Sequence, residues 1–125
     1  ELASVVYLHD GKNNFKAQKL PSQAQFSPLI TSLTADLNKD GITDLLTAGN
    51  LLGVNPHLGQ YDASVGEVFL GNNQYSFDYL PNKQHGLWLS GEVKKLAVIN
   101  IGKQKVLVAV INNQRPMFFS LSVDE

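Results

Sequence analysis

One stretch of nine residues constrains this chain more than any other part of it. It reads D-x-N-x-D-G-x-x-D, with aspartates at positions one, five and nine, an asparagine at three and a glycine at six. Oxygen-bearing side chains at positions one, three and five of a tight loop converge, and glycine at six permits the turn. Three carboxylates, one amide oxygen and one carbonyl suit Ca²⁺ better than zinc or copper. The predicted calcium ligands are Asp36, Asn38, Asp40, the backbone carbonyl of Ile42, and Asp44.

The residues around this loop favour a β-hairpin over an EF-hand. An EF-hand requires a bidentate glutamate at loop position twelve, which is Thr47 here, and a helix on each side. The segment that enters the loop, residues 29–35, is rich in β-branched residues, and Gly49 and Asn50 follow soon after the loop. We therefore expect a hairpin stapled by calcium between two short apolar strands. A polar Asx-type turn that binds no ion is the alternative.

Short apolar stretches separated by turn signals predict an all-β chain. Asp-Gly, Asn-Asn and Gly-Asn-Asn sequences tolerate positive φ and mark tight turns between the stretches. No segment keeps a helical period over several turns. The expected strands cover residues 3–8, 15–20, 29–36, 42–48, 64–70, 75–80, 92–100, 105–111 and 117–123.

The composition describes a single domain, residues 1–125, and excludes several classes of protein. The 125 residues are 43% hydrophobic and 17% charged, with a net charge of −1. Such a chain offers no basic footprint for nucleic acid or for an anionic membrane surface. It has no cysteine and no apolar run of about 18 residues, so we expect neither thiolate chemistry nor a membrane span. Because it begins with Glu1, we expect a processed or excised piece of a longer chain.

The sequence also contains an internal repeat with an offset of 62 residues. In the strand that enters the loop the offset drifts to about 63, because the corresponding turn at Gly102 is shorter and has no acids. We predict two copies, at about residues 3–50 and 65–112, followed by a final strand at 117–123. The matching positions are Val6 to Leu8 with Val68 to Leu70, Phe15 with Phe77, Leu45-Leu46 with Leu107-Val108, and Asn50 with Asn112.

The calcium loop followed by an apolar strand, with four short strands per copy, resembles the FG-GAP/VCBS repeat family. Members of that family build β-propellers whose blades carry calcium hairpins. The resemblance therefore implies two four-stranded antiparallel repeats resembling propeller blades, with the ion held by the five residues named above. The second copy departs from the loop pattern, and no ligand is carried over to it. Other similar segments are residues 48–50, 59–64, 68–77 and 90–93.

The same resemblance implies a non-enzymatic module of an exported, cell-surface or periplasmic bacterial protein. Its role would be adhesion through a protein or glycan partner. An accessory, non-catalytic part of a larger secreted polysaccharide-active or oxidative enzyme is the alternative. A closed propeller needs about four blades, so two blades imply missing neighbours or self-association through free strand edges.

Candidate catalytic side chains form no recognisable pattern. His57, Asp62 and Ser64 share one region, but the G-x-S-x-G elbow of a serine hydrolase is absent. His9 and His85 lack the H-x-x-x-H spacing of a zinc site. We expect all five residues to have structural or solvent-exposed roles.

Two further sets of side chains could serve a carbohydrate enzyme. Glu67 and Glu92 could form a carboxylate pair as in glycosidases, but we expect them at the outer ends of strands. Trp88 with Tyr61 and Tyr79 could stack on a sugar, whereas burial between sheets is the favoured role for Trp88.

Overall fold

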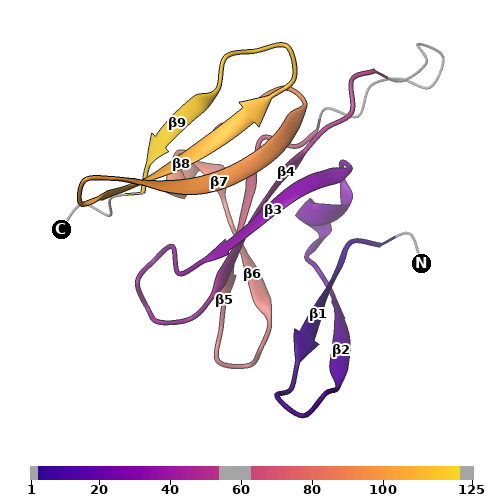
Figure 1. The fold of residues 1–125 in the computed structure, drawn as a ribbon. Coiled ribbons are helices and arrows are strands. Elements are labelled where there is room, and N and C mark those ends of the chain that lie inside the picture. The colour runs from indigo at the N-terminus through magenta and orange to yellow at the C-terminus, as the bar shows by residue number, and fades with distance from the viewer. Residues whose placement is uncertain (1–2, 54–62, 122–125) are drawn as a thin grey trace.

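The computed structural model describes residues 3–53 and 63–121, in which nine strands form three antiparallel sheets (Figure 1). The all-β prediction is thereby confirmed. In each sheet the strands follow chain order: β1-β2, then β3-β4-β5-β6, then β7-β8-β9. The bounds are β1 Val5–His9, β2 Phe15–Lys19, β3 Leu29–Ala35, β4 Asp44–Gly49, β5 Glu67–Gly71, β6 Phe77–Leu80, β7 Val93–Ile101, β8 Gln104–Ile111 and β9 Met117–Ser120.

Two short helical segments join the strands of the described residues. A 3-10 turn, η1, covers Ser22–Gln25 between β2 and β3, and a one-turn helix, α1, covers Asn82–His85 after β6. In the part of the chain that the structure describes, no helix is long and apolar enough to cross a membrane.

Strand β4 lies at the centre of the described fold. All six of its residues are buried, and it pairs with β3 on one side and β5 on the other. Successive side chains of a strand point to opposite faces, so Leu45 and Leu46 enter two different cores. An unbroken run of apolar and small residues is what a strand covered on both faces requires.

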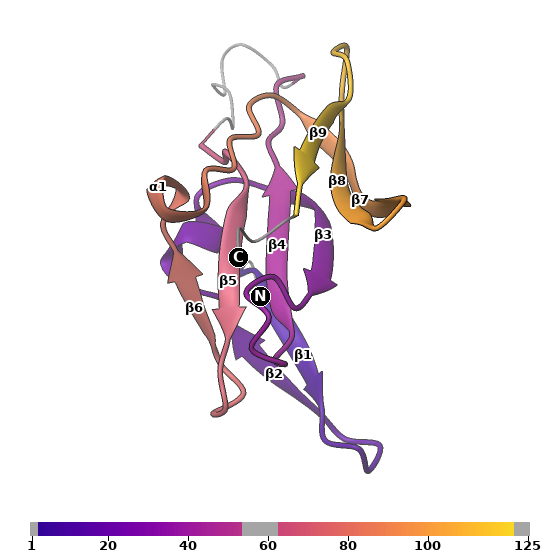
Figure 2. The same cartoon turned by 90° about the vertical axis from the view of Figure 1, so that its left-hand side faces the viewer.

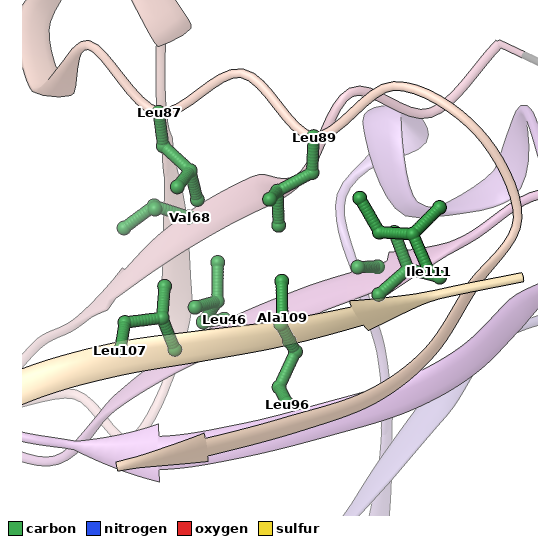
Figure 3. Packing of buried hydrophobic residues seen from close by; sticks show 10 residues of the cluster. Leu46, Val68, Leu87, Leu89, Leu96, Leu107, Ala109 and Ile111 are labelled. Atoms are coloured by element: carbon green, nitrogen blue, oxygen red, sulfur yellow. The ribbon is translucent and has the colours of Figure 1, made fainter. Parts of the chain in front are cut away.

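The four-stranded sheet is packed on both faces (Figures 1 and 2). On one face, Leu45 and Phe69 pack with Leu20, directly after β2, and with Ala24 of η1. Val6 of β1 packs against this cluster. On the other face, a larger core joins the sheet to β7–β9 (Figure 3). Its buried members are Leu46, Ala48, Val68, Leu87, Leu89, Val93, Leu96, Leu107, Ala109 and Ile111.

The boundaries of the sheets differ from the predicted repeat copies. We expected the four strands of residues 3–50 to form one sheet. Instead, β1 and β2 form a sheet of their own, while β3 and β4 pair with β5 and β6. The reason is that β4 and β5 pair directly, with Leu45 opposite Phe69, although a long connection separates them. The described strands form no closed propeller or barrel.

The hairpins β1–β2 and β5–β6 nevertheless share one register. Subtracting 62 from each residue number turns every pair of β5–β6 into a pair of β1–β2. The pair Phe69 and Tyr79, for example, corresponds to the pair Tyr7 and Ala17. Local strand pairing therefore follows the spacing that the sequence indicated.

The turns of these two hairpins correspond as well. The side chain of Asp10 accepts backbone hydrogen bonds from the residues two and four positions later, at 2.7 and 3.2 Å. Asn72 does the same, at 3.0 and 3.1 Å. The non-glycine residue with positive φ is Asn13 in the first turn and Tyr75 in the second, again 62 apart, and the first turn adds Gly11 with a φ of +80°. Both are Asx-type turns in which a side-chain oxygen replaces a backbone acceptor.

The hairpins β3–β4 and β7–β8 share a register and an irregularity. A β-bulge interrupts the first between Leu29 and Thr31 and the second between Val93 and Lys95. The offset in residue number from β4 to β8 is 62. From β3, the strand that enters the loop, to β7 the offset is 64, whereas the sequence predicted about 63. In the second hairpin the strands run on to a tight turn at Gly102, where the first hairpin carries the acidic loop.

Trp88 does not lie between the sheets as expected, since its side chain is 60% exposed. Its neighbours Leu87 and Leu89 enter the larger core instead. Because alternate side chains of an extended segment point to opposite sides, burial of the two leucines turns the tryptophan outward. The last strand ends at Ser120, and the remainder of the predicted strand, residues 122–123, lies outside the described residues.

The common register of the two hairpins provides a matched test of the packing. Phe69→Ala should lower the free energy of unfolding by about 3–5 kcal/mol, because Phe69 is fully buried. Tyr7→Ala, at the corresponding position of β1, should cost less than about 1 kcal/mol, because Tyr7 is 64% exposed. Urea unfolding followed by circular dichroism measures both values. Equal losses in the two variants would contradict the packing described here.

Candidate metal-binding loop

The loop between β3 and β4 is a tight turn that depends on glycine. It begins after Ala35 and ends at Asp44, so it joins two strands of one hairpin, as predicted. Gly41 has a φ of +85°, and Lys39 has a φ of +63°. A Cβ atom at Gly41 would meet nothing within 4 Å, so the glycine is needed for its left-handed backbone and not for space.

Three of the predicted ligands turn their side-chain oxygens toward the backbone of the loop. Asp36 accepts hydrogen bonds from the N–H groups of Asp40 and Gly41, at 3.2 and 2.9 Å. Asn38 Oδ1 accepts from Asp40 N at 3.1 Å, and Asp40 Oδ1 accepts from Ile42 N at 2.8 Å. These bonds hold oxygens of loop positions one, three and five against the backbone of the turn.

The fourth side chain, Asp44, fastens the loop to the sheet. It is fully buried, and its two carboxylate oxygens accept hydrogen bonds from Leu37 N at 2.7 Å and Gly71 N at 2.9 Å. Gly71 must be glycine because a Cβ atom there would lie 2.3 Å from the carbonyl oxygen of Thr43. Asp44 thus connects the start of the loop with the end of β5. Sequence reasoning missed this contact because no local signal pairs residues 44 and 71.

The donor set of the loop fits Ca²⁺, although it is not a preformed cluster of acids. In residues 3–53 and 63–121, no three His, Cys, Asp or Glu side chains are grouped so as to hold a metal. Each carboxylate oxygen has a second lone pair, so the N–H bonds leave capacity for a cation. Asn38 Nδ2 donates to Asp40 Oδ2 at 2.9 Å, so a cation that used this carboxylate oxygen would compete with the amide for it. The assignment of Asp36, Asn38, Asp40, Ile42 and Asp44 as ligands stays a prediction.

A second group of polar side chains is buried where β4 ends and β5 begins. Asn50 donates from Nδ2 to the carbonyls of Ser64 and Gly91, at 2.7 and 3.0 Å. Its Oδ1 accepts from the hydroxyl of Ser27 at 2.8 Å and from Ser64 N at 2.9 Å. The buried amide of Asn50 therefore connects its own segment with those of Ser27, Ser64 and Gly91. This role is structural.

Ser64 is engaged by a carboxylate in the described structure. Its Oγ donates to Glu67 Oε2 at 2.9 Å, and Thr47 Oγ1 donates to the same oxygen at 3.3 Å. His57 and Asp62, the other members of the triad considered above, lie outside the described residues. The contacts of Ser64 are those of a buried structural hydroxyl.

Glu67 and Glu92 have different surroundings and different acidities. Both stand at or beside the beginning of a strand, but both are largely buried. Burial raises the pKa of the Glu67 carboxyl, and the two hydroxyl donors oppose that shift only in part. The side chain of Lys94, 3.1 Å from Glu92, lowers the pKa of Glu92, assisted by a hydrogen bond from Asn112. Each glutamate is held by its own partners.

The remaining aromatic and histidine candidates have local structural contacts. Tyr79 packs its ring on Phe69, with ring centroids 5.9 Å apart, while Trp88 is exposed. Tyr61 lies outside the described residues. The Nδ1 atoms of His9 and His85 each accept the backbone N–H of the residue two positions later.

Asp44 predicts a stability effect that does not involve a metal. In the presence of a chelator, Asp44→Asn should lower the free energy of unfolding by about 1–3 kcal/mol, because an amide NH₂ would face a buried N–H donor. Asp36→Asn, on an exposed residue that keeps one acceptor oxygen, should cost less than about 1 kcal/mol. Chemical denaturation measures both costs. A cost for Asp36→Asn as large as that for Asp44→Asn would contradict the role of Asp44 in holding the loop to β5.

Glu67 predicts a pH dependence whose sign is fixed by its raised pKa. The folded state favours the protonated carboxyl, so the contribution of Glu67 is greatest below 4.5 and is lost as the pH rises through the folded pKa. The free energy of unfolding of wild type minus that of Glu67→Gln should therefore fall as the pH rises from 4.5 through the folded pKa of Glu67. The same difference for Glu92→Gln should instead rise with pH, at pH values below 4.5, because the pKa of Glu92 is lowered. If the two stability differences changed with pH in the same direction, the surroundings described for Glu67 and Glu92 would be wrong.

Comparisons of the chain with protein-family models, with curated proteins and with solved structures found no match. The resemblance to the FG-GAP/VCBS repeat family therefore rests on the loop residues and on the internal repeat of this chain.

Proposed function

We propose that this chain is a non-enzymatic, calcium-stabilised β-module of the FG-GAP/VCBS kind. Its context would be an exported or cell-surface protein in which the module presents a binding surface for a protein or a glycan. The observation that carries the proposal is the loop between β3 and β4. There Asp36, Asn38 and Asp40 stand at the positions that calcium loops use, and their oxygens accept backbone N–H groups of the loop on either side of and at Gly41.

The charge of the loop favours a bound cation. Three aspartates fall within nine residues, and one of them, Asp44, is fully buried. Drawing these carboxylates together costs electrostatic repulsion, and a divalent cation bound between them would offset it. The backbone hydrogen bonds of Asp36 and Asp40 already restrict both side chains, so little rotamer freedom remains to be lost on binding.

Because Asp44 joins the loop to β5, an ion bound in this loop would have a structural role. Asp44 bonds to Leu37 within the loop and to Gly71 at the end of β5, next to the turn of the β5–β6 hairpin. Fixing the loop therefore also fixes the contact between two hairpins of the central sheet. Binding to the folded state alone adds its free energy to the free energy of unfolding.

Thermal unfolding with Ca²⁺, with Mg²⁺ and with a chelator tests the proposal. Calcium at a hundredfold excess over its dissociation constant should add about 2.7 kcal/mol and raise the Tm of wild type. Mg²⁺ should have a smaller effect, because it gives up its bound water reluctantly. Asp40→Ala should abolish the calcium response, because it removes a carboxylate of the inner set.

Asp10→Asn is the matched control for that experiment. Asp10 is also an aspartate in an Asx-type turn, and Asn72 fills the corresponding place in the β5–β6 turn. The Asp10→Asn variant should fold and keep the full calcium response. If wild type melts at the same temperature in calcium and in chelator, the loop is a polar turn and the proposal is lost.

A further inference from the structure

The outer faces of the first and third sheets carry exposed apolar side chains. On β1–β2 these are Tyr7 and Phe15, and on β7–β9 they include Ile99, Val110 and Phe118. Phe118 is 62% exposed. Large apolar groups gathered on the face of a sheet mark a surface that another body covers.

The register of the third sheet indicates what kind of body covers its outer face. The strand pair β8–β9 has the same register as β4–β5. Adding 62 to the residue numbers of β4 and 50 to those of β5 turns the pair Leu46 and Val68 into the pair Val108 and Phe118. In the central sheet, Leu46 and Val68 are buried against the sheet that follows in the chain. Val108 and Phe118 therefore occupy the positions that a following sheet would cover.

The outer face of the first sheet, β1–β2, corresponds to the other face of the central sheet. Tyr7 and Phe15 correspond to Phe69 and Phe77 of the central sheet. Phe69 and Phe77 belong to the cluster that packs against the preceding part of the chain, around Leu20. Tyr7 and Phe15 therefore occupy the positions that a preceding sheet would cover.

We propose that a second copy of this chain covers these surfaces in a head-to-tail arrangement. The β1–β2 face of one copy, with Tyr7 and Phe15, packs on the outer face of β7–β9 of the next, with Phe118. The contact repeats between two copies the packing of the central sheet on β7–β9 within one copy (Figures 1 and 2). This inference does not depend on calcium binding.

Such a contact is heterologous, because it joins two different faces of the same chain. After the first contact the pair keeps one free face of each kind, one on each copy, so association continues into longer chains or closes into a ring. A two-stranded face covers only part of a three-stranded one, so the buried area is small. We expect association between about 10 µM and about 1 mM, the range of small interfaces.

Sedimentation velocity and light scattering over that concentration range test the proposal. The mean mass of wild type should rise beyond that of a dimer as the concentration increases. Tyr7→Glu and Phe118→Glu should each abolish self-association, because each destroys one of the two faces. Trp88→Glu is the matched control: Trp88 is 60% exposed and precedes β7, so it belongs to neither the first nor the third sheet, and the variant should associate like wild type.

Mixing the two disabled variants distinguishes this arrangement from a symmetric one. Tyr7→Glu keeps an intact β7–β9 face and Phe118→Glu keeps an intact β1–β2 face, so an equimolar mixture should form a discrete dimer and stop there. Circular dichroism and the Tm of each variant confirm that it folds. Wild type that stays monomeric throughout would exclude a second copy as the occupant. Self-association of either variant alone, or a mixture that stays monomeric while wild type associates, would overturn the head-to-tail arrangement.

Discussion

The burial of β4 on both faces is the constraint on which the rest of the structure depends. Leu45 and Leu46 are neighbours in sequence but belong to different cores, one shared with Leu20 and Phe69 and the other with the third sheet. A strand with two apolar faces cannot lie at the surface of a single sheet without exposing one of them. The chain must therefore supply a layer on each side, and it does so with the segments before and after the central sheet.

The acidic loop is connected to this core through one carboxylate. Asp44 is the first residue of β4, and it joins the loop to β5 by accepting N–H bonds from both. At the corresponding place in β8 stands Val106, where the hairpin closes in a tight turn and there is no long loop to hold. The buried acid and the loop occur together in one hairpin and are absent together from the other.

Much of the fold was predictable because local patterns carry it. Strand positions, the tight turns after β1 and β5, and the hairpin around the acidic loop follow from β-propensity, turn residues and spacing. Even the repeat offset of 62 agrees with the register of two hairpins. The grouping of hairpins into sheets was not predictable, because β4 and β5 pair across a long connection that leaves no periodic signal.

The sequence by itself determined the local conformations: which residues are extended, where the chain turns, and which oxygens can gather inside the loop around Gly41. The tertiary structure alone decided which strand pairs with which, that Asp44 holds β5 as well as the loop, and that Trp88 faces outward while its neighbours are buried. The physical reason is the range of the interactions. Turns and strands are set by neighbouring residues, whereas partners and burial are chosen by contacts between segments far apart in the chain.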